Sequence, residues 1–126
     1  MLDDTNDTPV LDTIALMTAA SIERSNLSAH EFILVRLAAL AATDARPLSY
    51  LAHVAPSVDA EVTLEQVQDV LVTVAPIIGT ARVTSAALNI AEALGVAVAI
   101  AEEELIAALE YEEEDDEIDE DDDEEA

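Results

Sequence analysis

Two helix-start signals of the same kind constrain the fold of this chain more than any other feature. Ser28 is followed three residues later by Glu31, and Thr63 is followed three residues later by Gln66. In each pair the first side chain can cap the third helical N–H while the second reaches back to the cap, which is the capping-box pattern. The sequence therefore predicts that helices begin next to Ser28 and Thr63.

Apolar residues recur at helical spacing along most of the chain, and Pro and Gly separate the segments. Residues 70–78 are rich in β-branched side chains and have strand propensity, but the capping box before them favours a helix. Gly95 is expected to cap one helix and to separate it from the next. The prediction is an all-α fold of about six helices, covering residues 9–24, 29–43, 47–55, 64–78, 81–94 and 96–111.

The 126 residues suit one domain, and the aromatic content limits how its core is built. Phe32, Tyr50 and Tyr111 are the only aromatic residues, so the core must consist mainly of Ala, Val, Leu and Ile. Because 52% of the chain is apolar, part of that surface is expected to be buried against copies of the same chain. We divide the chain into a flexible N-terminus (1–7), a helical domain (8–111) and a disordered acidic tail (112–126).

The net charge of −25 is concentrated near the C-terminus, where residues 110–125 hold fourteen carboxylates and no cation. Such a charge argues against nucleic acid and anionic membranes as partners, because both require Lys and Arg. Adaptation to a salt-rich cytoplasm is a further interpretation of this acidity. No signal peptide and no apolar run of membrane-spanning length is evident. We therefore expect a cytoplasmic protein that does not enter membranes.

The stretch from His53 onward resembles the carboxymuconolactone decarboxylase family, within the alkylhydroperoxidase D-like superfamily. In that family a His ends a short helix, a Thr-x-Glu-Glu-type start follows ten residues later, and the next helix ends in Ala-Pro-x-x-Gly-x-Pro-Arg. Here these features correspond to His53, residues 63–66 and residues 75–82, and residues 31–41 look like the family's central helix. The resemblance covers about residues 28–109 and implies an all-α domain that assembles as a trimer or hexamer, with pockets near the subunit contacts.

The chain departs from the peroxidase branch of this superfamily, which carries Cys-x-x-Cys-x-x-x-His. Arg46 and Ser49 stand at the two thiol positions, and the whole chain contains no cysteine. Cysteine-dependent peroxidase activity is therefore excluded, and the chain resembles the decarboxylase branch, which uses a His-containing pocket. Thr80 and Ala81 replace that family's usual bulky residue and proline, and the acidic tail is an addition.

His53 is the strongest candidate for a catalytic residue, because a histidine can act as acid or base near neutral pH. Its alternative is a structural histidine bonded to the backbone at a helix end. The resemblance places Glu31 near the pocket, where a carboxylate could orient His53, but Glu31 is also explained as the capping partner of Ser28.

Two further residues are candidates for substrate binding. Arg82 could clamp a substrate carboxylate with two hydrogen bonds, or it could form a salt bridge with a nearby acid. Tyr50 lies one turn before His53 and is expected to serve in packing more than in catalysis. His30, in the first turn of a helix, is expected to be solvated. No spacing typical of a metal site is present, so we expect neither a metal nor a cofactor.

Two functions remain open on the sequence alone. The first is a decarboxylase-like homo-oligomer that acts on a small carboxylate or lactone through a His-based pocket. The second is a non-catalytic oligomeric scaffold whose acidic tails bind a basic protein partner or keep the assembly soluble. A loose calcium site on the tail or mimicry of DNA by the tail are weaker interpretations of the same charge.

Overall fold

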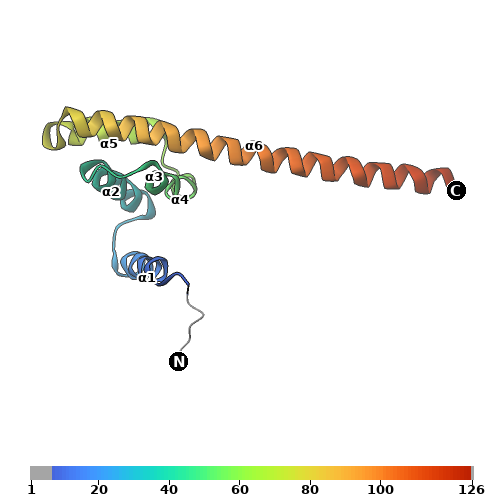
Figure 1. Ribbon diagram of the computed structural model, residues 1–126, viewed down its shortest axis with the longest axis horizontal. Helices are drawn as coiled ribbons and strands as arrows, with labels where there is room; N and C mark the ends of the chain where they lie inside the picture. Colours follow the sequence, from blue (N-terminus) through green and yellow to red (C-terminus); the bar gives the residue numbers. More distant parts are fainter. Residues whose placement is uncertain (1–6, 126) are drawn as a thin grey trace, which may run out of the picture.

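The computed structural model describes the backbone of residues 7–125 and the side chains of residues 7–113. Within that range the chain is helical and has no strand, which confirms the all-α class. The helices are α1 (Pro9–Arg24), α2 (Ala29–Ala42), α3 (Pro47–Leu51), α4 (Val54–Asp59), α5 (Leu64–Ile78) and α6 (Thr80–Glu125). Figure 1 shows α2 to α5 gathered against the first half of α6, with α1 set apart and the rest of α6 projecting beyond the bundle.

Both capping boxes form as expected. The Glu31 N–H donates to Ser28 Oγ at 3.1 Å, and the Ser28 N–H donates to Glu31 Oε1 at 3.1 Å. The Gln66 N–H donates to Thr63 Oγ1 at 3.1 Å, and the Thr63 N–H donates to Gln66 Oε1 at 3.0 Å. Because the second box opens α5, the β-branched residues 70–78 are helical and the strand alternative is wrong.

The predicted helix over residues 47–55 is two helices in the structure. A turn at Ala52 and His53 separates α3 from α4, and α4 continues to Asp59. Pro56, which the sequence marks as an end or a kink of the predicted helix, lies in the first turn of α4, where a helix needs no backbone N–H donor from it. His53 is therefore the N-cap residue of α4, not the last residue of a helix.

The predicted helix boundary at Gly95 is wrong, because α6 continues through this residue without interruption. A glycine inside a helix costs only about 1 kcal/mol relative to alanine, which neighbouring helix-forming residues outweigh. Gly79 is different: its φ of +90° lies in the region that favours glycine, and it ends α5.

The acidic segment predicted to be disordered forms the end of α6, whose backbone is helical to Glu125. This end projects away from every other helix (Figure 1). A lone helix is marginal in water, and carboxylates near its C-terminus are opposed by the helix dipole and by their mutual repulsion. We therefore retain the expectation that this end loses helical structure in dilute neutral solution.

The core is small and contains many alanines. The residues with little exposed surface come from α2, α3 and α6, and are Ile33, Leu37, Ala41, Tyr50, Ala86 and Ala93. The small side chains of Ala41, Ala86 and Ala93 let α2, α3 and α6 approach closely, and α5 packs against α2 and α6. α1 contributes no buried residue and takes no part in these main helix contacts.

One stretch of α6, Thr80–Glu113, is long and apolar enough to cross a membrane by length and composition alone. The same stretch supplies Ala86 and Ala93 to the core and packs against α2, α3 and α5. That behaviour also fits the core helix of a soluble domain, so the predicted absence of a membrane segment stays a prediction.

Candidate functional site

A cavity of about 260 Å³ lies where α2 to α6 meet, and its walls are almost entirely apolar. Its polar residues are His53, Ser57 and the hydroxyl-bearing Tyr50. The remaining lining residues are Leu37, Val54, Val58, Val62, Leu64, Val67, Ile90, Ala93 and Leu94. A wider depression between α2 and α5 has Asp69 as its only ionisable lining residue, so the chemistry available to the described residues is concentrated in the first cavity.

His53 is bonded to the residues four positions before and four positions after it, Ser49 and Ser57. Its Nδ1 lies 2.7 Å from the carbonyl oxygen of Ser49. Because a carbonyl oxygen can only accept, Nδ1 carries the hydrogen, and Nε2 of the neutral ring is left with a free lone pair. The Ser57 hydroxyl donates to the carbonyl of His53 at 2.5 Å and fixes the start of α4. This backbone bond is the one expected of a structural histidine, and it also sets the tautomer that a proton-accepting histidine needs.

Tyr50 packs in the core and also lines the cavity, with only 3% of its surface exposed. Its hydroxyl is buried and has no hydrogen-bond partner among the described residues. Burial raises the pKa of Tyr50, and the nearby Asp44 carboxylate raises it further. The phenol therefore stays protonated, and its hydroxyl is closed off from solvent in the structure.

Glu31 lies outside the cavity lining, and both its backbone and its side chain are used by the capping box with Ser28. The backbone N–H of Ser28 lowers the pKa of Glu31, and the Ser28 side chain lowers it further. In this chain the Ser49 carbonyl, and not Glu31, orients the ring of His53. The structural interpretation of Glu31 as a capping residue is thus the one that the geometry supports.

Arg82 also lies outside the cavity lining. Its Nη1 donates to the carbonyl of Ala42 at 2.9 Å, which places a positive charge at the C-terminal end of α2. Further along α6, Ser85 donates to Asp44 at 2.6 Å, and Asn89 donates to the carbonyl of Ala45 at 2.9 Å. This row of bonds ties the loop after α2 to α6, and the salt bridge considered for Arg82 is absent from the described residues.

Of the four residues singled out from the sequence, the structure brings His53 and Tyr50 to one cavity and leaves Glu31 and Arg82 elsewhere. Ser57 was missed, because the sequence analysis placed His53 near the end of a helix and gave no reason to consider a residue four positions further on. His30 is not simply solvated as expected: its Nε2 lies 2.9 Å from Gln66 Oε1 and links the starts of α2 and α5. The described side chains contain no cluster of three or more potential metal ligands.

Comparison with known proteins gives one match. A sequence profile described as the carboxymuconolactone decarboxylase family matches residues 9–93, which run from the first residue of α1 into α6. The matched range contains every cavity-lining residue except Leu94. No curated protein and no solved structure matched the chain.

Proposed function

Because this chain belongs to the carboxymuconolactone decarboxylase family, we propose that its cavity binds a small lactone or carboxylate and that His53 exchanges a proton with it. The observation that supports the proposal best is the hydrogen bond from His53 Nδ1 to the Ser49 carbonyl. This bond leaves Nε2 as the proton acceptor of a cavity-lining residue in apolar surroundings. Positioned acid–base groups of this kind contribute rate factors of about 10²–10⁴.

The walls of the cavity favour an uncharged lactone over its ring-opened carboxylate. His53 is the only lining residue that can carry a positive charge, and Arg82 is bonded to Ala42 outside the cavity. A carboxylate in apolar surroundings without a cationic partner is strongly disfavoured. We propose that a bound lactone reaches the Tyr50 hydroxyl, which is buried in the unliganded chain, and accepts a hydrogen bond from it through its neutral carbonyl oxygen. The volume of about 260 Å³ lies below the range of roughly 300–1,000 Å³ for drug-sized ligands, so the substrate is small.

The test compares each small lactone with its own ring-opened hydroxy acid, so that charge is the main difference between the two ligands. Binding is followed by ligand-observed NMR and turnover by loss of the lactone signal. His53→Gln is expected to reduce turnover at least 100-fold, whereas His30→Gln, outside the cavity, should leave it unchanged. Equal turnover by both variants would remove His53 from the mechanism, and tighter binding of the hydroxy acids would contradict the preference for lactones.

We also propose that the protein is a cytoplasmic homo-oligomer, either a trimer or a hexamer. Large apolar side chains on α1 and on α6 beyond the core are exposed in the single chain, which supports assembly with further copies. Light scattering coupled to size-exclusion chromatography measures the assembly directly, and a monomer at micromolar concentration would contradict the proposal.

A non-catalytic scaffold is the second candidate function, because Glu31 and Arg82 have structural partners and polar groups in the cavity are few. In that case the acidic tails bind a basic protein partner. A Lys-rich peptide should then bind the full chain but not a chain ending at residue 111, and comparable binding by both chains would contradict a role for the tail.

A further inference from the structure

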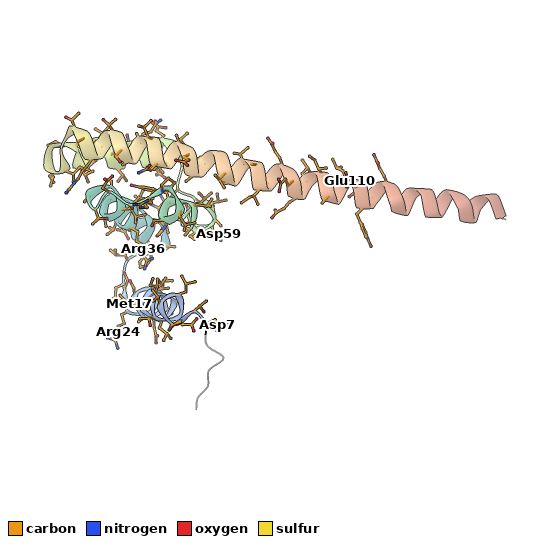
Figure 2. All side chains as sticks on the ribbon, viewed as in Figure 1. Asp7, Met17, Arg24, Arg36, Asp59 and Glu110 are labelled. Carbon is orange, nitrogen blue, oxygen red and sulfur yellow. The ribbon has the colours of Figure 1, made fainter. Side chains whose placement is uncertain are left out.

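Two helical surfaces of this chain have no partner among residues 7–113, whose side chains the structure describes. The first is the apolar face of α1, where Leu11, Ile14 and Ile22 are 52–63% exposed. The second is the outer segment of α6, which we define as residues 96–111, where Val98 and Leu109 are 51–55% exposed. Figure 2 shows the side chains of both surfaces standing free of the helical bundle. An apolar helix face that large is expected to be covered in solution.

We propose that the apolar face of α1 packs on the outer segment of α6 in a second copy of this chain, and that the second copy returns the same contact. This inference rests on the homo-oligomer proposed above and identifies its surfaces, but it does not depend on activity in the His53 cavity. The residues 9–93 that match the family profile include α1 but end before the outer segment.

The two surfaces have matching length and spacing. α1 has 16 residues and the outer segment spans residues 96–111, so each is about 24 Å long at 1.5 Å per residue. On α1 the side chains at positions i, i+3, i+7 and i+11 are Leu11, Ile14, Thr18 and Ile22. On the outer segment the same positions are Val98, Ala101, Leu105 and Leu109. Parallel alignment sets Ile14 opposite Ala101 and Thr18 opposite Leu105, so larger residues face smaller ones.

The charges favour the parallel orientation. α1 carries Asp12 in its first turn and the neighbouring pair Glu23 and Arg24 in its last turn. The outer segment is uncharged over residues 96–101 and acidic from Glu102 onward. Parallel packing sets Glu23 and Arg24, whose charges cancel, at the level of Glu110, whereas antiparallel packing sets Asp12 near Glu110 and adds a like charge without a cation.

The outer segment of α6 is covered more readily by α1 of a second copy than by α1 of the same chain. Figure 1 shows α2 between α1 and α6, and the four residues that join α1 to α2 reach only about 17 Å when fully extended. In Figure 2, Arg24 and Glu110 of one chain lie on opposite sides of the molecule, which leaves Arg24 of a second copy as the partner for Glu110.

The area is sufficient for a stable contact. Leu16 lies on the opposite side of α1, and without it four aliphatic side chains on α1 and four on the outer segment are at least 51% exposed. At an order of 80 Å² lost by each, two symmetric contacts bury roughly 1,300 Å², which lies within the standard range for specific interfaces. A reciprocal contact of this kind joins copies in pairs. It therefore selects the hexamer over the trimer among the two assemblies proposed above.

Engineered disulfides test the contact cleanly because the chain has no cysteine of its own. The paired variants Ile22→Cys/Leu109→Cys and Leu11→Cys/Val98→Cys are oxidised as full-length protein and separated on non-reducing gels. Both should give a covalent dimer, since a disulfide needs Cα atoms about 4.4–6.8 Å apart. The antiparallel control, Ile22→Cys/Val98→Cys, should remain monomeric on the gel.

Every other outcome overturns the proposal in an identifiable way. A dimer from Leu109→Cys alone indicates α6 pairing with α6, and a dimer from Ile22→Cys alone indicates α1 pairing with α1. A fast-migrating monomer indicates that α1 folds onto its own α6. If no pair cross-links but light scattering still finds an oligomer, the surface is wrong and the oligomer stands. A monomer by light scattering overturns both.

A charge variant gives a second measurement that does not depend on disulfide geometry. Leu105 is 60% exposed in the single chain, so Leu105→Glu should leave the helical content unchanged. We expect it to halve the mass measured by light scattering or to weaken assembly at least tenfold. Glu103→Gln, a neighbouring exposed change, serves as the control. Unchanged mass in Leu105→Glu would refute the contact.

Discussion

Replacing Tyr50 by phenylalanine should stabilise this protein, which is unusual for a change in a buried core. The Tyr50 hydroxyl is buried without a hydrogen-bond partner among the described residues, and the side chain is 3% exposed. A buried hydroxyl that lacks a partner costs about 1–3 kcal/mol, and phenylalanine keeps the same packing without that cost. We expect Tyr50→Phe to raise the free energy of unfolding by about 1–2 kcal/mol.

The assay is urea denaturation followed by circular dichroism, together with thermal melting. For a domain of this size each kcal/mol corresponds to about 4–8 °C in Tm. The pH dependence gives an independent check. The pKa of Tyr50 is raised above its ordinary value of 10.0, so above pH 10 the unfolded chain loses the phenol proton more readily than the folded chain does. The free energy of unfolding of the wild type therefore falls as pH rises above 10. The Tyr50→Phe variant should lose less stability over that alkaline range.

A loss of stability in Tyr50→Phe would refute the reasoning, because it would mean that the hydroxyl has a partner in solution. Ligand binding separates the remaining alternatives. If the phenol donates to a bound lactone, Tyr50→Phe should bind that lactone at least fivefold more weakly while being the more stable protein. Unchanged binding would leave Tyr50 a purely structural residue.

Three further predictions concern the glycine that ends α5, the glycine inside α6 and the acidic end of α6. Gly95→Ala should stabilise the protein by about 0.5–1 kcal/mol, because an added Cβ meets nothing within 4 Å and the residue lies inside a helix; Gly79→Ala should destabilise it by about 1–2 kcal/mol, because φ there is +90°. Chemical denaturation measures the free energy of unfolding of both variants. Equal changes at the two positions would contradict the view that only Gly79 has a backbone conformation that requires glycine. Deleting residues 112–126 should not reduce the number of helical residues per molecule at neutral pH, whereas below pH 4 the full chain should gain helix that the shortened chain lacks. Circular dichroism of the two chains checks this, and helix lost on deletion at neutral pH would show that the acidic end of α6 is stable by itself.

Features decided by neighbouring residues could be predicted from the sequence. The capping boxes at Ser28 and Thr63 depend on groups three residues apart, and both form. The start of α1 at Pro9 and the end of α5 at Gly79 follow from backbone preferences in the same way. Gly95 misled the prediction because glycine permits a helix end without requiring one, and the residues on both sides continue the helix.

The site was harder to predict, because it depends on which face of each helix is directed toward the cavity after packing. His53 was found because a lone histidine near a helix end is conspicuous, and its position in the cavity agrees with that choice. Glu31 and Arg82 lie on α2 and α6, which both contribute to the cavity, yet their side chains are not on the lining faces. A bond from His53 to the backbone was expected in its structural interpretation, but the sequence could not show that Ser49 supplies the acceptor, because every residue possesses a backbone carbonyl.

Because α6 continues through Gly95 without interruption, a rotation of this helix at the cavity also moves its far end. Ile90, Ala93 and Leu94 line the cavity, and Tyr111 lies on the same helix about 25 Å further along at 1.5 Å per residue. A rotation of α6 by about 5° about Leu94 displaces Tyr111 by about 2 Å, on the scale that separates a packed contact from a broken one. Had Gly95 ended the helix, the same rotation would have stopped at the edge of the cavity.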